Sequence, residues 1–175
     1  LKEIGVDNWQ SSIGYVPQKP LITSNSLREN IAFGEDLSCI DNNRVLKCIK
    51  LASLDDLLKN LPNGIFSHIG ERGKFLSGGQ AQRVAVARAL YQEPSILIFD
   101  EATSSQDAEN ENLIKKSIQN LKGKITVLSI SHNFNVIKNC DEIFVIDKGR
   151  VIESGSYEEL MKKSKYFIKM KNFLE

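Results

Sequence analysis

The stretch Ile96-Leu97-Ile98-Phe99-Asp100-Glu101 is a short apolar run that ends in two adjacent carboxylates. Nearly continuous apolar runs of this length are typical of parallel strands that are buried on both faces. Two further runs of the same kind, Thr126 to Ile130 and Ile143 to Ile146, follow along the chain. We therefore expect three strands of a parallel sheet. Asp100 and Glu101 would then lie at a carboxyl end, where open α/β sheets place their ligands.

The segments around these runs predict how the sheet continues. Helix-like segments, Asn110 to Leu121 and Asn133 to Asn139, separate the three runs, and strands that alternate with helices indicate an α/β fold. Upstream, Ile13 to Val16 predicts another strand. Downstream, Val151 to Glu153 predicts the return strand of a hairpin, and a final helix is expected to start at Ser156, which forms a capping-box pattern with the glutamate three residues later.

Between the first strand and Ile96 the apolar spacing becomes helical. The residues that carry this spacing are Leu46, Ile49, Leu54, Leu57, Leu58 and Leu61. A further helix is expected from near Ser77 to the residue before Pro94. We therefore expect residues 1–18 and 94–155 to form an α/β core, residues 19–93 to form an inserted helical subdomain, and residues 156–175 to form a C-terminal helix.

Composition excludes several classes of protein. The 175 residues carry a formal net charge of +1, which gives no global field that favours nucleic acid or an anionic membrane. The three cysteines, Cys39, Cys48 and Cys140, show no C-x-x-C spacing and favour a reducing compartment. No apolar run approaches the roughly 20 residues that cross a bilayer. The chain opens without a methionine, so we treat Leu1 as an interior position of a longer sequence.

The segment Leu76-Ser77-Gly78-Gly79-Gln80 is suited to bind phosphate. Its two glycines let backbone amides approach an anion, Ser77 adds a hydroxyl, and the following helix directs its positive end to the same point. A simpler interpretation also holds at this stage. Ser77 and Gln80 have the spacing of a capping box, which would only start the helix.

Four polar side chains follow predicted strands and could meet at one edge of the sheet. Asp100 could hold Mg²⁺ while Glu101 orients an attacking water, as phosphoryl transfer requires. His132 follows the strand that ends at Ile130 and could donate to a γ-phosphate. Gln18 follows the first strand, and its amide could contact Mg²⁺ or water. Taken singly, each is equally explained as a solvated residue at the end of a strand.

Taken together and in this order, these segments are similar to the ATPase domain of ABC transporters over almost the whole chain. Tyr15-Val16-Pro17-Gln18 resembles the Q-loop of the family, and Leu76 to Gln80 matches its signature motif without a change. Ile96 to Glu101 resembles Walker B with its catalytic glutamate, Asp107 falls on the D-loop aspartate, and His132 on the switch histidine. The D-loop carries a polar Gln106 where the family has an apolar residue, which weakens the expected communication between the two ATP sites.

The resemblance implies an incomplete P-loop ATPase-like parallel sheet, ATP and Mg²⁺ as cofactors, and a head-to-tail dimer with a second nucleotide-binding domain. Its catalytic residues would be Glu101, His132 and Gln18, and Asp100 and Gln18 would hold the metal. The residues that would contact the nucleotide of the other subunit are Ser77, Gly78, Gly79, Gln80 and Asp107.

Two segments resemble exporters more than importers, Ser26 to Gly34 and Gly70-Glu71-Arg72-Gly73. In the family these surfaces meet the membrane domain. The resemblance therefore implies a transmembrane domain of an ABC exporter as a partner, on the same or a separate chain, and a location at the cytoplasmic face of the cell membrane. Two alternatives remain, a non-transport ABC ATPase and a non-catalytic module that completes the ATP site of a partner.

The phosphate-binding Walker A pattern G-x-x-x-x-G-K-[ST] does not occur in the 175 residues. In the family, the Walker A strand lies between the strand that ends before His132 and the strand Ile143 to Ile146. We therefore expect that this chain alone does not hydrolyse ATP. We also expect it to compensate for the missing strand by rearranged pairing, edge-to-edge dimerisation or strand exchange.

Overall fold

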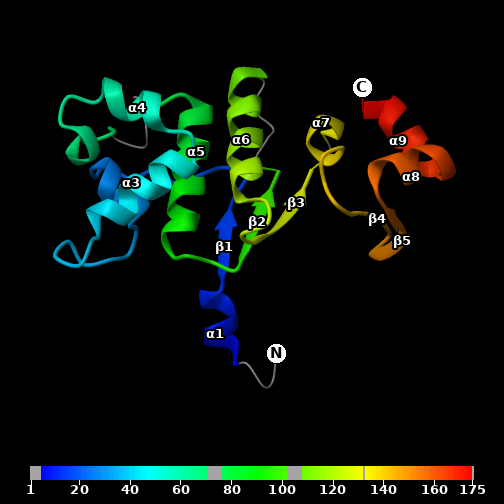
Figure 1. Cartoon of the computed structure of the whole chain (residues 1–175), viewed down its shortest axis with the longest axis horizontal. Helices are drawn as coiled ribbons and strands as arrows, with labels where there is room; N and C mark the ends of the chain where they lie inside the picture. The colour runs from blue at the N-terminus through cyan, green and yellow to red at the C-terminus, as the bar shows by residue number, and fades with distance from the viewer. Residues whose placement is uncertain (1–4, 71–75, 102–107, 132, 175) are drawn as a thin grey trace. The chain divides into compact units, whose positions relative to one another are not determined.

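The computed structural model describes residues 5–70, 76–101, 108–131 and 133–174, and every structural statement below refers to these residues. The chain divides into two compact units, Leu1–Ile130 and Ser131–Glu175, each of which is described by itself (Figure 1). None of the helices in the described ranges is long and apolar enough to cross a membrane.

A three-stranded parallel sheet forms the centre of the first unit. Its strands are β1 (Ile13–Val16), β2 (Ile96–Asp100) and β3 (Thr126–Ile130), and β2 lies in the middle. Leu97 and Phe99, which point to one face of β2, are fully buried, and the residues of its other face are half-buried. The mixed α/β class and the parallel sheet predicted from the sequence are thus confirmed.

Short helices fill the segment between β1 and β2. They are α2 (Leu27–Ile31), α3 (Asn42–Leu51), α4 (Asp55–Asn60), the 3-10 helix η1 (Gly64–Phe66) and α5 (Gly78–Tyr91). A further helix, α1 (Val6–Ser11), precedes β1, and α6 (Ala108–Leu121) connects β2 to β3. Side chains cap the starts of α2, α3 and α5: Ser26 caps α2, Asp41 accepts hydrogen bonds from the first turn of α3, and Ser77 caps α5.

Helix α5 joins the helical segment to the sheet. It contacts α2, α3, α6 and β1, and most of its residues from Gln82 to Tyr91 are buried. One hydrophobic core runs from Val45 and Ile49 of α3, through Val84 of α5, to Phe99 of β2. Figure 1 shows α5 in green beside α3 and the sheet. The helices between β1 and β2 and the sheet therefore share one core in the first unit.

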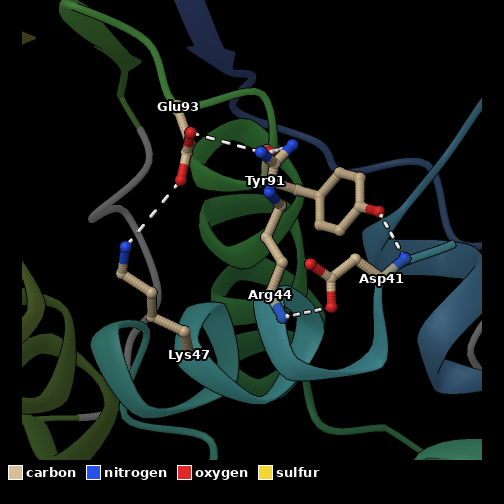
Figure 2. A network of polar contacts seen from close by, with 5 residues as sticks. All are labelled: Asp41, Arg44, Lys47, Tyr91 and Glu93. Carbon is tan, nitrogen blue, oxygen red and sulfur yellow. Dashed lines mark hydrogen bonds and ion pairs between the residues drawn. The ribbon is translucent and has the colours of Figure 1, made fainter.

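A polar network holds the carboxyl end of α5 against α3 (Figure 2). Arg44 forms an ion pair with Glu93 at 3.2 Å, and its guanidinium lies 5.4 Å from the centre of the Tyr91 ring. The Tyr91 hydroxyl accepts a hydrogen bond from the backbone N–H of Asp41 at 3.1 Å. Lys47 adds a longer, exposed contact to Glu93 at 3.8 Å. Exposed ion pairs contribute little, so the hydroxyl contact and the stacked guanidinium carry most of this attachment.

The second unit contains an antiparallel hairpin covered by helices. Its elements are α7 (Phe134–Ile137), β4 (Ile143–Asp147), β5 (Arg150–Gly155), α8 (Tyr157–Lys163) and α9 (Lys165–Leu174). The hairpin turns at Lys148 and Gly149, whose φ angles are both positive, as tight hairpin turns require. A small core forms around Phe167, whose ring lies 5.1 Å from that of Phe134.

Two predictions about the strands were wrong in part. Leu128 and Ile130 of β3 are at least half exposed, as are Phe144 and Ile146 of β4. The burial patterns give the reason: exposed residues alternate with half-buried ones along β3 and with mostly buried ones along β4, so one face of each strand is open. Strand β4 is antiparallel to its partner and shows the alternating burial of such strands. How the chain compensates for a missing strand stays a prediction.

Two helices also differ from the sequence expectation. The helix expected from Ser156 to the end breaks at Ser164, where the backbone is extended and the Ser164 hydroxyl accepts from the N–H of Phe167 at 2.8 Å, so a second helix starts there. The helix expected over Asn133 to Asn139 is limited to α7, because Asn133 caps it and it ends at Ile137. The proposed division into core, helical and C-terminal parts remains an interpretation.

Gly14 of β1 lies where the strand packs tightly against α5 and β2. A methyl group at Gly14 would lie 2.9 Å from the carbonyl oxygen of Ala89 and 2.9 Å from Leu97 Cδ1. We expect Gly14→Ala to lower the free energy of unfolding by about 1–3 kcal/mol, because buried backbone and side chain must move apart.

Urea unfolding followed by circular dichroism measures this effect. Gly78→Ala is the matched control, since a methyl group there would meet no atom within 4 Å, and alanine in a helix is favoured over glycine by roughly 0.5–1 kcal/mol. Equal midpoints for Gly14→Ala and the wild-type chain would show that β1 does not pack against α5 in this way.

Candidate functional site

The carboxyl end of β2 presents the two predicted carboxylates. Asp100 is the last residue of the strand, and Glu101 follows with a φ of 46°, a conformation that non-glycine residues seldom adopt. The backbone N–H of Glu101 donates to the carbonyl oxygen of Ile130 at 2.9 Å, which ties it to the end of β3. The backbone of Glu101 is thus held in an uncommon conformation that redirects the chain as the strand ends.

Gln18 reaches Glu101 from the neighbouring strand. Its Nε2 donates a hydrogen bond to Glu101 Oε2 at 2.7 Å. The register explains the contact: Val16 pairs with Phe99, and Gln18 and Glu101 each lie two residues beyond this pair. Parallel strands end at the same edge, so two residues at equal distances past one pair meet there. The structure therefore brings together two of the predicted catalytic residues, while their roles remain predictions.

Tyr15 is a member of this group that sequence reasoning did not select as a site residue. Its hydroxyl donates to Asp100 Oδ2 at 2.7 Å. Tyr15 pairs with Ile98, and Asp100 is two residues further on, so both side chains leave the same face of the sheet. The hydrogen bond to Asp100 is the main cause that raises the pKa of Tyr15, with smaller contributions from desolvation and from the negative charge of Asp100.

The oxygen donors at this edge fit Mg²⁺ better than a transition metal. Mg²⁺ takes one or two carboxylates and keeps several waters or phosphate oxygens, whereas softer metals need histidine or cysteine. Within the described ranges no group of three or more His, Cys, Asp or Glu residues could form a metal cage. Gln18 uses its nitrogen toward Glu101, which leaves its carbonyl oxygen for a metal near Asp100.

The signature segment starts α5 through a capping box. The Gln80 N–H donates to Ser77 Oγ at 3.2 Å, and the Ser77 N–H donates to Gln80 Oε1 at 2.9 Å. The simpler interpretation of these two residues is therefore correct as a local structure, and it leaves open a second role toward phosphate. Gly78 is exposed and Gly79 is buried, and no side chain lies close enough to Gly78 to require a glycine there.

The signature residues form no hydrogen bond with this group in the described part of the chain: neither Gln18 nor Asp100 bonds to Ser77 or Gln80. Asp107 and His132 lie outside the described residues.

Comparison with known proteins assigns the family. The sequence model of a family described as ABC transporter matches residues 1–104, more than half of the chain. The chain therefore belongs to the ABC transporter family, and the recognition based on its motifs is confirmed.

Two similar proteins are named as members of ABC sub-family or family B. The chain is 43% identical over 155 residues to the mouse protein named ATP-binding cassette sub-family B member 10, mitochondrial, which covers 88% of this chain and 22% of that protein. It is 38% identical over 162 residues to ABC transporter B family member 21 of Arabidopsis thaliana, and this match covers 93% of this chain and 12% of that protein. The chain thus spans between about a tenth and a quarter of the length of these two relatives.

A solved structure agrees with the assignment. The structure described as a bacterial Atm1-family ABC exporter with ATP bound aligns with a TM-score of 0.84 at 34% identity. The alignment covers 95% of this chain and 29% of that one. The fold class is therefore that of the ATP-binding part of an exporter.

The contact between Tyr15 and Asp100 predicts that the Tyr15 hydroxyl titrates at a raised pH. A hydroxyl that donates to a carboxylate keeps its proton to higher pH, so the folded pKa of Tyr15 exceeds the unfolded value of about 10. The contact stabilises the fold below pH about 10 and is lost as the pH rises through the folded pKa. We expect Asp100→Asn to lower the pKa of Tyr15 toward about 10.

The difference in absorbance at 295 nm between the wild-type chain and Tyr15→Phe isolates this titration from the other tyrosines. Asp147→Asn, at the end of β4, is the matched control and should leave the midpoint unchanged. A midpoint that Asp100→Asn does not lower would rule out the hydrogen bond in solution.

Proposed function

We propose that the chain is the nucleotide-binding part of an ABC exporter and that its parent hydrolyses ATP as a head-to-tail dimer. The observation that carries the proposal is the hydrogen bond of 2.7 Å between Gln18 and Glu101, next to Asp100 at the carboxyl edge of the parallel sheet. An amide and two carboxylates at this edge are the groups that phosphoryl transfer to water needs. The family assignment and the likeness to an ATP-bound exporter support the same conclusion.

Each predicted catalytic or metal-binding residue has a separate task in this proposal. When bound, Mg²⁺ and ATP supply the charge neutralisation and the phosphoryl group. Asp100 and the Gln18 carbonyl oxygen would hold the metal. Glu101 accepts a hydrogen bond from the attacking water and polarises it, while the Gln18 amide fixes the orientation of the carboxylate. His132 stabilises the γ-phosphate.

The signature segment acts on the nucleotide of the other subunit. Ser77, Gly78, Gly79 and Gln80 bring the start of α5, with its free N–H groups and positive dipole, to that phosphate. Asp107 contributes to the same interface. This arrangement gives a reason for a glycine at the exposed position 78, where no contact among the described residues requires one.

The surface around α2 is proposed to meet the transmembrane domain. Exposed apolar side chains gather on the segments before and after α2, at Leu21, Phe33 and Leu37, and η1 adds Phe66. Arg88 lies 4.8 Å from the centre of the Phe33 ring and Arg28 lies 5.2 Å from that of Phe66. Apolar groups of this kind on a surface favour a protein partner. The membrane-bound parent would place this chain at the cytoplasmic face of the cell membrane.

The 175-residue chain alone should release no phosphate from Mg·ATP, because its sequence contains no Walker A pattern to hold the β- and γ-phosphates. A malachite-green assay measures this directly. Turnover by the isolated chain that disappears in Glu101→Gln would contradict the expectation. It would also favour the catalytic reading over the alternative of a non-catalytic module that only completes a partner's ATP site.

A fused protein tests the proposed function itself. The segment that precedes the matched region in the bacterial exporter, with its Walker A loop, is joined ahead of residue 1, and phosphate release is measured. We expect turnover that Glu101→Gln lowers about 100-fold or more, since a positioned general base contributes roughly 10²–10⁴ in rate.

Glu142→Gln is the matched control for the fused protein, because Glu142 is an exposed carboxylate in the second unit. It should leave the rate unchanged. A rate that is equal in Glu101→Gln and in the wild-type fusion would reject the assignment of Glu101 as the residue that activates water.

A further inference from the structure

The side chain of Gln82 holds the backbone immediately before Gln18. Gln82 lies in the second turn of α5, and its Nε2 donates to the carbonyl oxygen of Pro17 at 2.9 Å. Gln82 is only 5% exposed, so water cannot readily replace this bond. The bond is part-buried, and its loss would leave the nearly buried Gln82 amide without this acceptor, which is costly.

A fixed Pro17 carbonyl also fixes the start of Gln18. The peptide group is planar, so the carbonyl of Pro17 and the N–H of Gln18 rotate as one unit. The proline ring holds φ of Pro17 near −65° and removes one of the two rotations that could turn this plane. The direction in which the chain enters Gln18 is therefore set by a side chain of α5.

Arg88, further along α5, holds the chain beyond Gln18. Its Nη1 donates to the carbonyl oxygen of Leu21 at 2.7 Å, and its Nε donates to the carbonyl oxygen of Asn30, also at 2.7 Å. Asn30 is fully buried, and its side-chain oxygen accepts from the N–H of Thr23 at 2.9 Å. Both ends of the loop that carries Gln18 are thus attached to one helix.

We propose that Gln82 is a positioning residue that makes Gln18 move together with α5, so that a shift at the signature segment changes the hydrogen bond between Gln18 and Glu101. Gly78 and Gln82 are four residues apart and lie on the same face of the helix. The expectation that nucleotides bind at the signature segment and at Gln18 rests on the proposed function. The mechanical connection through Gln82 does not. This route joins the two ATP sites without the D-loop, in which Gln106 replaces the expected apolar residue.

The carboxyl end of α5 offers a matched control. The Tyr91 hydroxyl accepts one backbone hydrogen bond from Asp41 at 3.1 Å, as Figure 2 shows. Tyr91→Phe therefore removes one hydrogen bond between α5 and a loop, as a Gln82 variant does, yet touches nothing near Gln18. A general loosening of α5 would appear in both Tyr91→Phe and the Gln82 variant. A specific effect on Gln18 would appear in the Gln82 variant only.

The first test observes the side-chain amide of Gln18 by NMR in the 175-residue chain labelled with ¹⁵N-glutamine. The signal is assigned by its absence in Gln18→Met, and Glu101→Ala gives its position without the hydrogen bond. We expect Gln82→Met, and separately Gln82→Glu, to move the signal toward the position seen in Glu101→Ala. Tyr91→Phe should leave it in place.

Two results of this test would overturn the proposal. One is a Gln18 signal that stays at the wild-type position in both Gln82 variants while Glu101→Ala moves it. The other is an equal movement in Tyr91→Phe, which would show a general effect of α5. Having two Gln82 variants of similar size keeps the test decisive if one of them does not fold.

The second test measures kinetics in the fused protein described above. We expect Gln82→Met to lower kcat about threefold to tenfold, because this is the size of effect that the loss of one hydrogen bond produces. The KM for ATP should be unchanged. In a Gln18→Ala background the same change should lower kcat no further, because Gln82 acts through Gln18. Losses that multiply would overturn the proposal. A fusion without any turnover would reject the proposed function, and the NMR comparison would still decide the role of Gln82.

Discussion

The parallel pairing of β1 with β2 is the constraint on which the site depends. Its register sets Val16 beside Phe99, and the chain leaves both strands at the same edge. Gln18 and Glu101 meet two residues later, and Tyr15 reaches Asp100 from the same pair of strands. A shift of the register by one residue would turn these side chains to opposite faces of the sheet. The chemistry proposed for this edge therefore depends first on how β1 pairs with β2, and only then on the individual residues.

Helix α5 gives this edge its support. Ser77 caps the start of the helix, and Val84 and Val86 are buried along it. Gln82 and Arg88 hold the loop around Gln18. Its far end is attached to α3 by Tyr91 and Arg44. One rigid element thus connects a segment expected to contact one nucleotide with a loop expected to contact another. Rigid helices packed in a shared core transmit displacement because they cannot deform continuously.

Much of this arrangement could be predicted from the sequence. The bounds of β1 and β3 follow from short apolar runs, and the pairing of Gln18 with Glu101 follows from the rule that parallel strands end at one edge. Tyr15 could not be found in this way, because it lies within β1 and not beyond its end, so its contact with Asp100 needs the register of the strands as well. The exposure of Leu128 and Ile130 could not be predicted either, since the sequence of an apolar strand does not tell whether another element covers its face. The break at Ser164 was missed because it needs long-range support, a hydrogen bond from the Ser164 hydroxyl to Glu153 on β5.

The central claim is that an amide from one strand end and a carboxylate from the next form one functional unit. A crystal structure of the 175-residue chain tests it most directly. The account predicts that Gln18 Nε2 lies within hydrogen-bonding distance of Glu101, with Val16 paired to Phe99 and with the Pro17 carbonyl bound by Gln82. A structure in which β1 pairs in another register, or in which Gln18 and Glu101 leave opposite faces of the sheet, would contradict it.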